Sequence, residues 1–376
     1  MRRHLDHAAT APLRPVAEAA WAAAASLVGN PSSTHASGRR ARARLEDARE
    51  QLADAVGAHP TEVVFTSGGT EADNLAVLGG AAAGAALGRP RVAASTVEHP
   101  AVAQAVASLG ADRAHWLAVD ADCVVTPRAL ATLDASVAVV SVVAVNNETG
   151  TLQPLDAVLA AGRRAGALVH SDAVQALGHV PLVFAASGLD AMSLSAHKIG
   201  GPVGVGALVV RRGVRLAPVT FGGGQEARLR SGTVPVALAA GFAAAAAEAV
   251  AEQQGEAERL GRLRADLVGG LTALDGVVVN GGDRVSPAIC HATVTGCRAD
   301  DLLLLLDAEG FDCSTGSACA AGVHQPSDVL LAMGRSEADA AASLRFSFGP
   351  STTADDVTAL LAALGDLVPR ARAAAG

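Results

Sequence analysis

Short hydrophobic runs alternate with polar loops and helical stretches along the first part of the chain. β-Branched and other apolar residues gather at 62–65, 137–143, 167–170, 191–194 and 206–210, and most of these runs lead into polar or glycine-rich loops. The repetition of strand, loop and helix predicts a mostly parallel sheet covered by helices on both faces. Ligands of such sheets bind beyond the carboxyl ends of the strands, where the polar clusters of this chain fall.

The pattern changes after residue 235, where a long helical stretch begins and runs to about residue 274. It is followed by apolar strands around 277–279 and 288–294, a leucine-rich helix at 300–309, a glycine-rich loop, a strand at 343–348 and a final helix from Thr353. This second part predicts a smaller α+β domain, which the long helix links to the first.

Composition narrows the class of protein without naming a reaction. The chain has 376 residues, of which 50% are hydrophobic and 18% are charged, so it predicts a globular protein of two domains. The net charge of -8 and the pI near 5.7 argue against a surface that coats nucleic acid. They suit a protein that handles small molecules.

Membrane, export and disulfide signals are absent from the sequence. The alanine-rich run at 239–251 contains Glu248 and is followed by Glu252, which indicates a helix of a folded domain rather than a membrane span. Residues 1–4 lead into polar sequence without an apolar signal core, which predicts a cytoplasmic protein. Five cysteines without a CxxC pair predict neither a disulfide framework nor a structural zinc site.

Lys198 is the first candidate for chemistry, because it follows the run 191–194 directly and small residues come after it. An amine in such a position can form an imine with a carbonyl cofactor. Asp172 ends the preceding predicted strand, and a carboxylate there can keep a pyridine nitrogen protonated, with Gln175 one helical turn further on. Taken alone, Lys198 is more simply a surface lysine, and Asp172 is equally the N-cap of a helix beginning near Ala173.

A phosphate cradle is predicted at 67–74, with the sequence Ser-Gly-Gly-Thr-Glu-Ala-Asp-Asn. Glycines at a helix start expose backbone N–H groups, and the helix dipole favours an anion there, although such a sequence alone is also ordinary capping. His99 can stack on a flat ring in a chain that has no tyrosine, and its alternative is a hydrogen-bonded core histidine. Together with Asp172 and Lys198, in this order at successive strand ends, these groups describe one site.

Several motifs extend this pattern over nearly the whole chain. They lie at 5–10, 29–33, 67–74, 146–150, 171–175, 195–201, 222–226, 230–233, 314–319 and 344–347. In this order they resemble the cysteine desulfurases of the class V aminotransferase family. The resemblance implies an α/β fold, the pyridoxal-phosphate-dependent transferase fold type I. It places a large cofactor-binding domain at 13–252. A small domain, which carries a catalytic cysteine loop, takes 1–12 and 253–376.

The resemblance implies pyridoxal 5'-phosphate as the cofactor and assigns roles around its ring. Lys198 would hold the cofactor through a Schiff base and move the substrate's α-proton. Asp172 would pair with the pyridine nitrogen, and His99 would stack on the ring and could shuttle a proton. Gln175 and Asn147 would lie by the ring oxygen or the substrate.

Further roles concern the phosphate and the substrate. The phosphate would be held by Gly69, Thr70, Ser195 and His197. Thr233 would reach the phosphate of a neighbouring subunit, which implies a homodimer with shared sites. Arg345 would bind the carboxylate of L-cysteine, since a guanidinium fork matches a carboxylate bidentately; without the motif it is an exposed strand arginine that pairs with a surface acid.

Cys319 separates a desulfurase from its relatives, because it would take the substrate's sulfur as a persulfide and release alanine. Small residues surround it in Gly-Ser-Ala-Cys-Ala-Ala-Gly, which favours a mobile loop, and the reactive form is the thiolate. The alternative is a small buried residue. That alternative is the expectation for Cys290 and Cys297, and Cys123 is expected to be incidental. Strand packing is the expectation for Cys313, whose influence on Cys319 stays open. No resident metal is expected, although Cys319 could transiently ligate an iron–sulfur cluster.

The stretch after Cys319 resembles the longer-loop group of the family, which is commonly linked to iron–sulfur cluster and thiolated-tRNA supply. A sulfur-acceptor protein, either a scaffold or a tRNA thiolase, is therefore expected, without direct nucleic-acid or membrane binding. Some members have a longer tail that helps to dock a scaffold, so that docking stays open for this chain. Two alternatives remain: a selenocysteine lyase or other class V enzyme, which would not need Cys319, and a non-catalytic sulfur carrier or scaffold.

Overall fold

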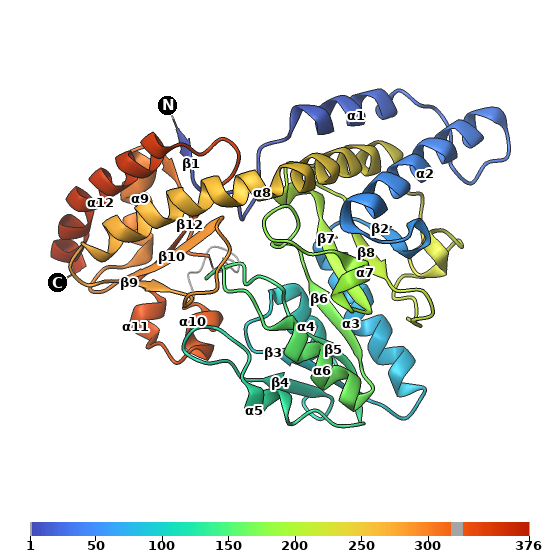
Figure 1. Ribbon diagram of the computed structural model, residues 1–376, viewed down its shortest axis with the longest axis horizontal. Helices are drawn as coiled ribbons and strands as arrows, with labels where there is room; N and C mark the ends of the chain where they lie inside the picture. Colours follow the sequence, from blue (N-terminus) through green and yellow to red (C-terminus); the bar gives the residue numbers. More distant parts are fainter. Residues whose placement is uncertain (1, 317–325, 376) are drawn as a thin grey trace.

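The computed structural model describes residues 2–316 and 326–375 and has two parts that lie side by side (Figure 1). The larger part is built on a seven-stranded sheet with the strand order β2-β8-β7-β6-β5-β3-β4. Its strands are β2 (Val63–Thr66), β3 (Arg91–Ser95), β4 (Ala114–Leu117), β5 (Val137–Ser141), β6 (Leu168–Asp172), β7 (Ala191–Ser195) and β8 (Gly206–Val210). Only β8 runs antiparallel to its neighbours. The predicted mostly parallel α/β sheet is confirmed.

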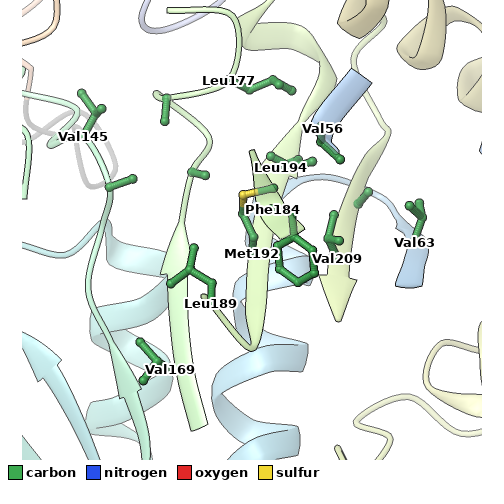
Figure 2. Packing of buried hydrophobic residues seen from close by; sticks show 14 of the residues in the cluster. Val56, Val63, Val145, Val169, Leu177, Phe184, Leu189, Met192, Leu194 and Val209 are labelled. Atoms are coloured by element: carbon green, nitrogen blue, oxygen red, sulfur yellow. The ribbon is translucent and has the colours of Figure 1, made fainter. Parts of the chain in front are cut away.

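Helices cover the large sheet because the strands are apolar on both faces. The helices of this part are α1 (Pro15–Ala25), α2 (Ala36–Val56), α3 (Gly69–Ala85), α4 (Pro100–Ala107), α5 (Pro127–Leu130), α6 (Leu155–Ala165) and α7 (Phe184–Ser187). Figure 2 shows Phe184, Met192, Leu194 and Val209 packed together within the largest buried cluster. This core fixes β6 and β7 rigidly, and both strands lead into the loops that carry the predicted site residues.

The long helix α8 (Val236–Thr272) runs from the large part into the small one (Figure 1). By length and composition it is apolar enough to cross a membrane, and half of its most apolar window is buried. Phe242 and Ala243 belong to the core of the large part, and Leu263 and Leu267 belong to the core of the small part. Its apolar residues are therefore used within the fold, which is the behaviour of a core helix.

The small part holds an antiparallel sheet of β9 (Val277–Asn280), β10 (Ile289–Val294) and β12 (Ser343–Ser347), with β10 in the middle. The small part also contains the helices α9 (Ala299–Ala308), α10 (Asp328–Ala332), α11 (Glu337–Ala340) and α12 (Ala354–Ala375). At the N-terminus, β1 (Arg3–His4) pairs in parallel with β11 (Phe311–Asp312), so the first residues join this part. The domain bounds at 12/13 and 252/253 stay a prediction.

The helix that the sequence suggested near Ala173 is wrong. Residues 174–179 form consecutive turns after β6 and not a regular helix. Asp172 accepts a hydrogen bond from the Val174 amide at 2.8 Å, so its carboxylate fixes a tight turn. Gln175 therefore lies on a turn rather than one helical turn into a helix.

Candidate functional site

A cavity of about 710 Å³ opens at the carboxyl ends of β5, β6 and β7. Its lining includes most of the residues expected from the sequence: Gly69, Thr70, His99, Asn147, Asp172, Gln175, Ser195, His197, Lys198 and Arg345. Cys319 lies outside the described residues, but Gly316 and Pro326, on either side of it in the chain, also line the cavity. Thr233 does not: it is exposed and borders a separate hollow with Arg42 and Gln225.

Lys198 sits in a short 3-10 turn directly after β7, as its sequence position predicted. Its amine donates hydrogen bonds to the carbonyl oxygens of Ala8 and Ala9, both at 2.7 Å. Burial and the positive charge of Arg345 lower the pKa of Lys198 to about 8. The amine is therefore neutral in an appreciable fraction of molecules near neutral pH, which a nucleophile requires.

Lys198 is also the only lysine among the 29 lysine and arginine residues of the chain. The sequence alone shows that Lys198 is the single lysine. It means that a chemistry requiring a side-chain primary amine has one possible residue in this protein. It also makes any covalent label on a lysine side chain assignable without ambiguity.

Asp172 and His99 lie near one another with a further carboxylate, Asp73. One oxygen or nitrogen atom from each of the three lies within 4.8 Å of the others. Burial raises the pKa of Asp172, and the charge of His99 opposes that shift. Burial lowers the pKa of His99, and Asp172 opposes it in turn. Each charge therefore favours the ionised form of the other group, and a protonated pyridine nitrogen beside Asp172 would likewise favour the ionised carboxylate.

The start of α3 provides the features expected of a phosphate cradle. Within the described part of the chain no side chain caps this helix end, and its first residues, Gly69 and Thr70, line the cavity. Their N–H groups are therefore free to bind an anion. A methyl group on Gly69 would lie 2.7 Å from Val174 Cγ2, so only glycine lets the backbone approach this closely. Ser195 Oγ is buried without a hydrogen-bond partner, and His197 lies on the same turn as Lys198. These groups fit a phosphorylated cofactor.

Arg345 on β12 is buried and already engaged. Its Nη2 lies 2.7 Å from the carboxylate of Asp6, and its Nη1 donates to the Asn147 carbonyl at 2.9 Å. The alternative of an exposed arginine paired with a surface acid is therefore wrong as to exposure. The guanidinium faces the cavity that holds Lys198 and Asp172.

Two buried acids in the cavity wall were not singled out from the sequence. Glu98 accepts hydrogen bonds from Ser95 and from the Val143 amide, and burial raises its pKa to about 8. Glu148 accepts a hydrogen bond from Ser327, and burial raises its pKa to about 7. Glu148 stands in one of the motifs that carried the resemblance, beside Asn147, and Glu98 directly precedes His99 in the chain. Only the fold shows that both acids are buried.

The four cysteines that the structure describes are packing residues. Cys123, Cys290 and Cys297 are buried, and burial raises the pKa of each thiol, to about 12 for Cys123 and about 11 for Cys290. Cys313 packs at the edge of the small core, and its pKa is raised to about 12 by burial and by Asp6. None of these four lines the cavity. The packing expectation for Cys290, Cys297 and Cys313 is confirmed.

The lowered pKa of Lys198 predicts how loading of the cofactor depends on pH. The neutral amine reacts with an aldehyde, so incorporation of added pyridoxal phosphate into cofactor-free protein is expected to rise as pH passes about 8. Borohydride reduction followed by peptide mass mapping measures it on Lys198, with the N-terminal amine as an internal comparison. A rise centred near 10.5, the ordinary lysine value, would contradict the environment described for Lys198.

Comparisons with known proteins agree with this geometry. A family model described as aminotransferase class-V matches residues 3–360. An IscS-like cysteine desulfurase of Mycobacterium tuberculosis is 49% identical over 383 residues, which cover 99% of this chain and 98% of that protein. This chain belongs to the cysteine desulfurase family. Its members are class-V, pyridoxal-phosphate-dependent enzymes, and the residues above fit that cofactor.

Further members of the family share its length and fold. A cysteine desulfurase of Frankia sp. is 40% identical and covers 98% of this chain and 90% of that protein. A solved structure of a NifS-like protein superposes with a TM-score of 0.90 at 31% identity and covers 98% of this chain and all of that one. The structure of DndA from Streptomyces lividans gives a TM-score of 0.77 at 36% identity, with 92% and 99% coverage.

Proposed function

We propose that this chain is a cysteine desulfurase that removes sulfur from L-cysteine, releases L-alanine and holds the sulfur as a persulfide on Cys319. The observation that carries the proposal is the convergence of Lys198, Asp172 and Arg345 on one cavity. The residues that flank the Cys319 segment, Gly316 and Pro326, border the same cavity. An amine, an acid, a carboxylate binder and a thiol-bearing segment are the parts that the reaction requires.

Bound pyridoxal phosphate supplies an electron sink for the bonds at the substrate's α-carbon. In the proposal its phosphate is held by the start of α3 with Ser195 and His197. Asp172 would keep the pyridine nitrogen protonated, and His99 would stack on the ring. Gly69 and Thr70 are the residues of the α3 start that would hold the phosphate. Asn147 and Gln175 would lie by the ring oxygen or the substrate.

The protein's own groups carry the remaining steps. Arg345 binds the cysteine carboxylate, and Lys198, once its amine is free, takes the proton from the α-carbon. The Cys319 thiolate then attacks the substrate sulfur, so that a sulfur–sulfur bond forms while the carbon–sulfur bond breaks. The electron pair of the broken bond stays with the carbon fragment. Lys198 returns a proton to the α-carbon, the carbon that lost the sulfur takes up a second proton, and the fragment leaves as alanine. His99 is placed to pass that proton.

A shared-site homodimer belongs to the same proposal. Thr233 matches a phosphate-binding position of the family, yet in one chain it is exposed and outside the cavity. A second copy that brings its own Thr233 to this cavity would reconcile both observations. Light scattering should then give the mass of two chains. We further propose a cytoplasmic enzyme that supplies iron–sulfur cluster assembly or tRNA thiolation through an acceptor protein.

One assay tests the activity. The purified holoenzyme, given L-cysteine and a thiol reductant, is expected to form alanine and sulfide in equal amounts. Protein that takes up pyridoxal phosphate but forms neither product would contradict the proposed function.

A further inference from the structure

The N-terminal segment 6–10 borders the cavity through Ala8 and Ala9 and contacts several groups expected to act there. Asp6 pairs with Arg345, and Ala8 accepts hydrogen bonds from Lys198 and from the Gln175 amide. The Thr10 hydroxyl lies 3.1 Å from His197 Nδ1. One short stretch, distant in sequence from all of these partners, therefore occupies polar groups on both parts of the protein.

This segment is held firmly against the strand that carries Arg345. Asp6 forms a parallel bridge with Ser347 of β12, and the Ser347 amide donates to the Leu5 carbonyl at 2.7 Å. The Ala8 amide donates to the Ser347 hydroxyl at 2.9 Å. Since Asp6 is bridged to β12, the strand that carries Arg345, their contact lies within the small part of the protein.

The ion pair is asymmetric in exposure and incomplete in hydrogen bonding. The Arg345 side chain is 5% exposed, whereas the Asp6 side chain is 21% exposed. Asp6 contacts only Nη2 of the guanidinium, and Arg345 Nε is buried without a hydrogen-bond partner. A buried arginine requires a counter-charge, and Asp6 supplies one to Arg345 in this structure.

We propose that Asp6 determines the affinity of the site for amino-acid carboxylates by standing in for the substrate's carboxylate on Arg345. The inference rests on the proposed function, since Arg345 is there the carboxylate-binding residue. In the substrate-free protein Asp6 balances the charge of Arg345. When an amino acid binds, its carboxylate must displace Asp6 or share the guanidinium with it. Displacement costs the existing ion pair, and sharing brings two negative charges together, so both cases weaken binding.

The test compares Asp6→Asn, which keeps size and removes the charge, with the wild-type holoenzyme. L-Alanine, the proposed product, is titrated while the visible absorbance of the bound cofactor is followed, so no turnover is required. The variant is expected to bind alanine more tightly, by roughly three- to tenfold. L-Alaninamide has the same amine and methyl group without a carboxylate, and its affinity is expected to stay the same in both proteins.

An alanine affinity that is unchanged or weaker in Asp6→Asn would overturn the inference. An equal change for alanine and alaninamide would overturn it too, because the effect would not involve the carboxylate. Asp6→Ser, smaller and also uncharged, gives the same comparison if the asparagine variant does not fold. The wild-type protein could form no sulfide while the Asp6→Asn variant still binds alanine more tightly. That result would refute only the proposed function, so failure of the function and failure of this inference are distinguishable.

Discussion

Cys319→Ala is expected to abolish sulfide release from cysteine, by about 10³-fold or more, while the absorbance of the bound cofactor stays. The thiolate is the only group of the proposed site that can accept the substrate sulfur. The four described cysteines are packed away from the cavity, and burial raises the pKa of each, so none of them can replace it. Sulfide and alanine are measured together on the loaded variant.

The matched control is Cys313→Ala, which removes a thiol six residues earlier in the sequence that packs on the core of the small part. It is expected to keep wild-type turnover. Undiminished sulfide release by Cys319→Ala would favour a class V enzyme that needs Lys198 and Asp172 alone, such as a selenocysteine lyase. Such a result would be compatible with the proposed cofactor site and would refute the proposed role of Cys319 as sulfur acceptor.

Lys198→Ala is expected to lose turnover by about 10³-fold or more, because the amine both holds the cofactor and moves the α-proton. Because Lys198 is the only lysine, borohydride reduction of the variant with pyridoxal phosphate should leave no lysine label. Lys198→Arg keeps the positive charge without a primary amine and should fail equally. A variant that turns over cysteine at the wild-type rate would exclude the proposed role of Lys198.

The strands and the residues at their ends were predictable because local sequence specifies them. The run 191–194 is apolar and leads into a lysine with small residues after it, and the structure places that lysine directly after β7. The start of α3 was predictable for the same reason, because glycines directly after a strand predict both a turn and the start of a helix.

Other features depend on contacts between distant residues and could not be predicted from the sequence. The prediction of a helix near Ala173 was wrong because the Asp172 carboxylate accepts a hydrogen bond within a turn instead of capping a helix. The Asp6–Arg345 pair joins residues 339 positions apart, and only the packing of the N-terminal segment on β12 creates it. Glu98 and Glu148 resemble loop acids in the sequence, yet the fold buries both and raises their pKa values.

The central claim is that the Lys198 amine and the Cys319 thiol act on one bound cofactor. The holoenzyme is treated briefly with L-cysteine, its thiols are alkylated, and its peptides are examined by mass spectrometry. The account predicts one additional sulfur atom on the peptide that contains Cys319 in the wild type, and none in Lys198→Ala. An additional sulfur atom on Cys313 or another cysteine instead, or its persistence on Cys319 in Lys198→Ala, would contradict the account.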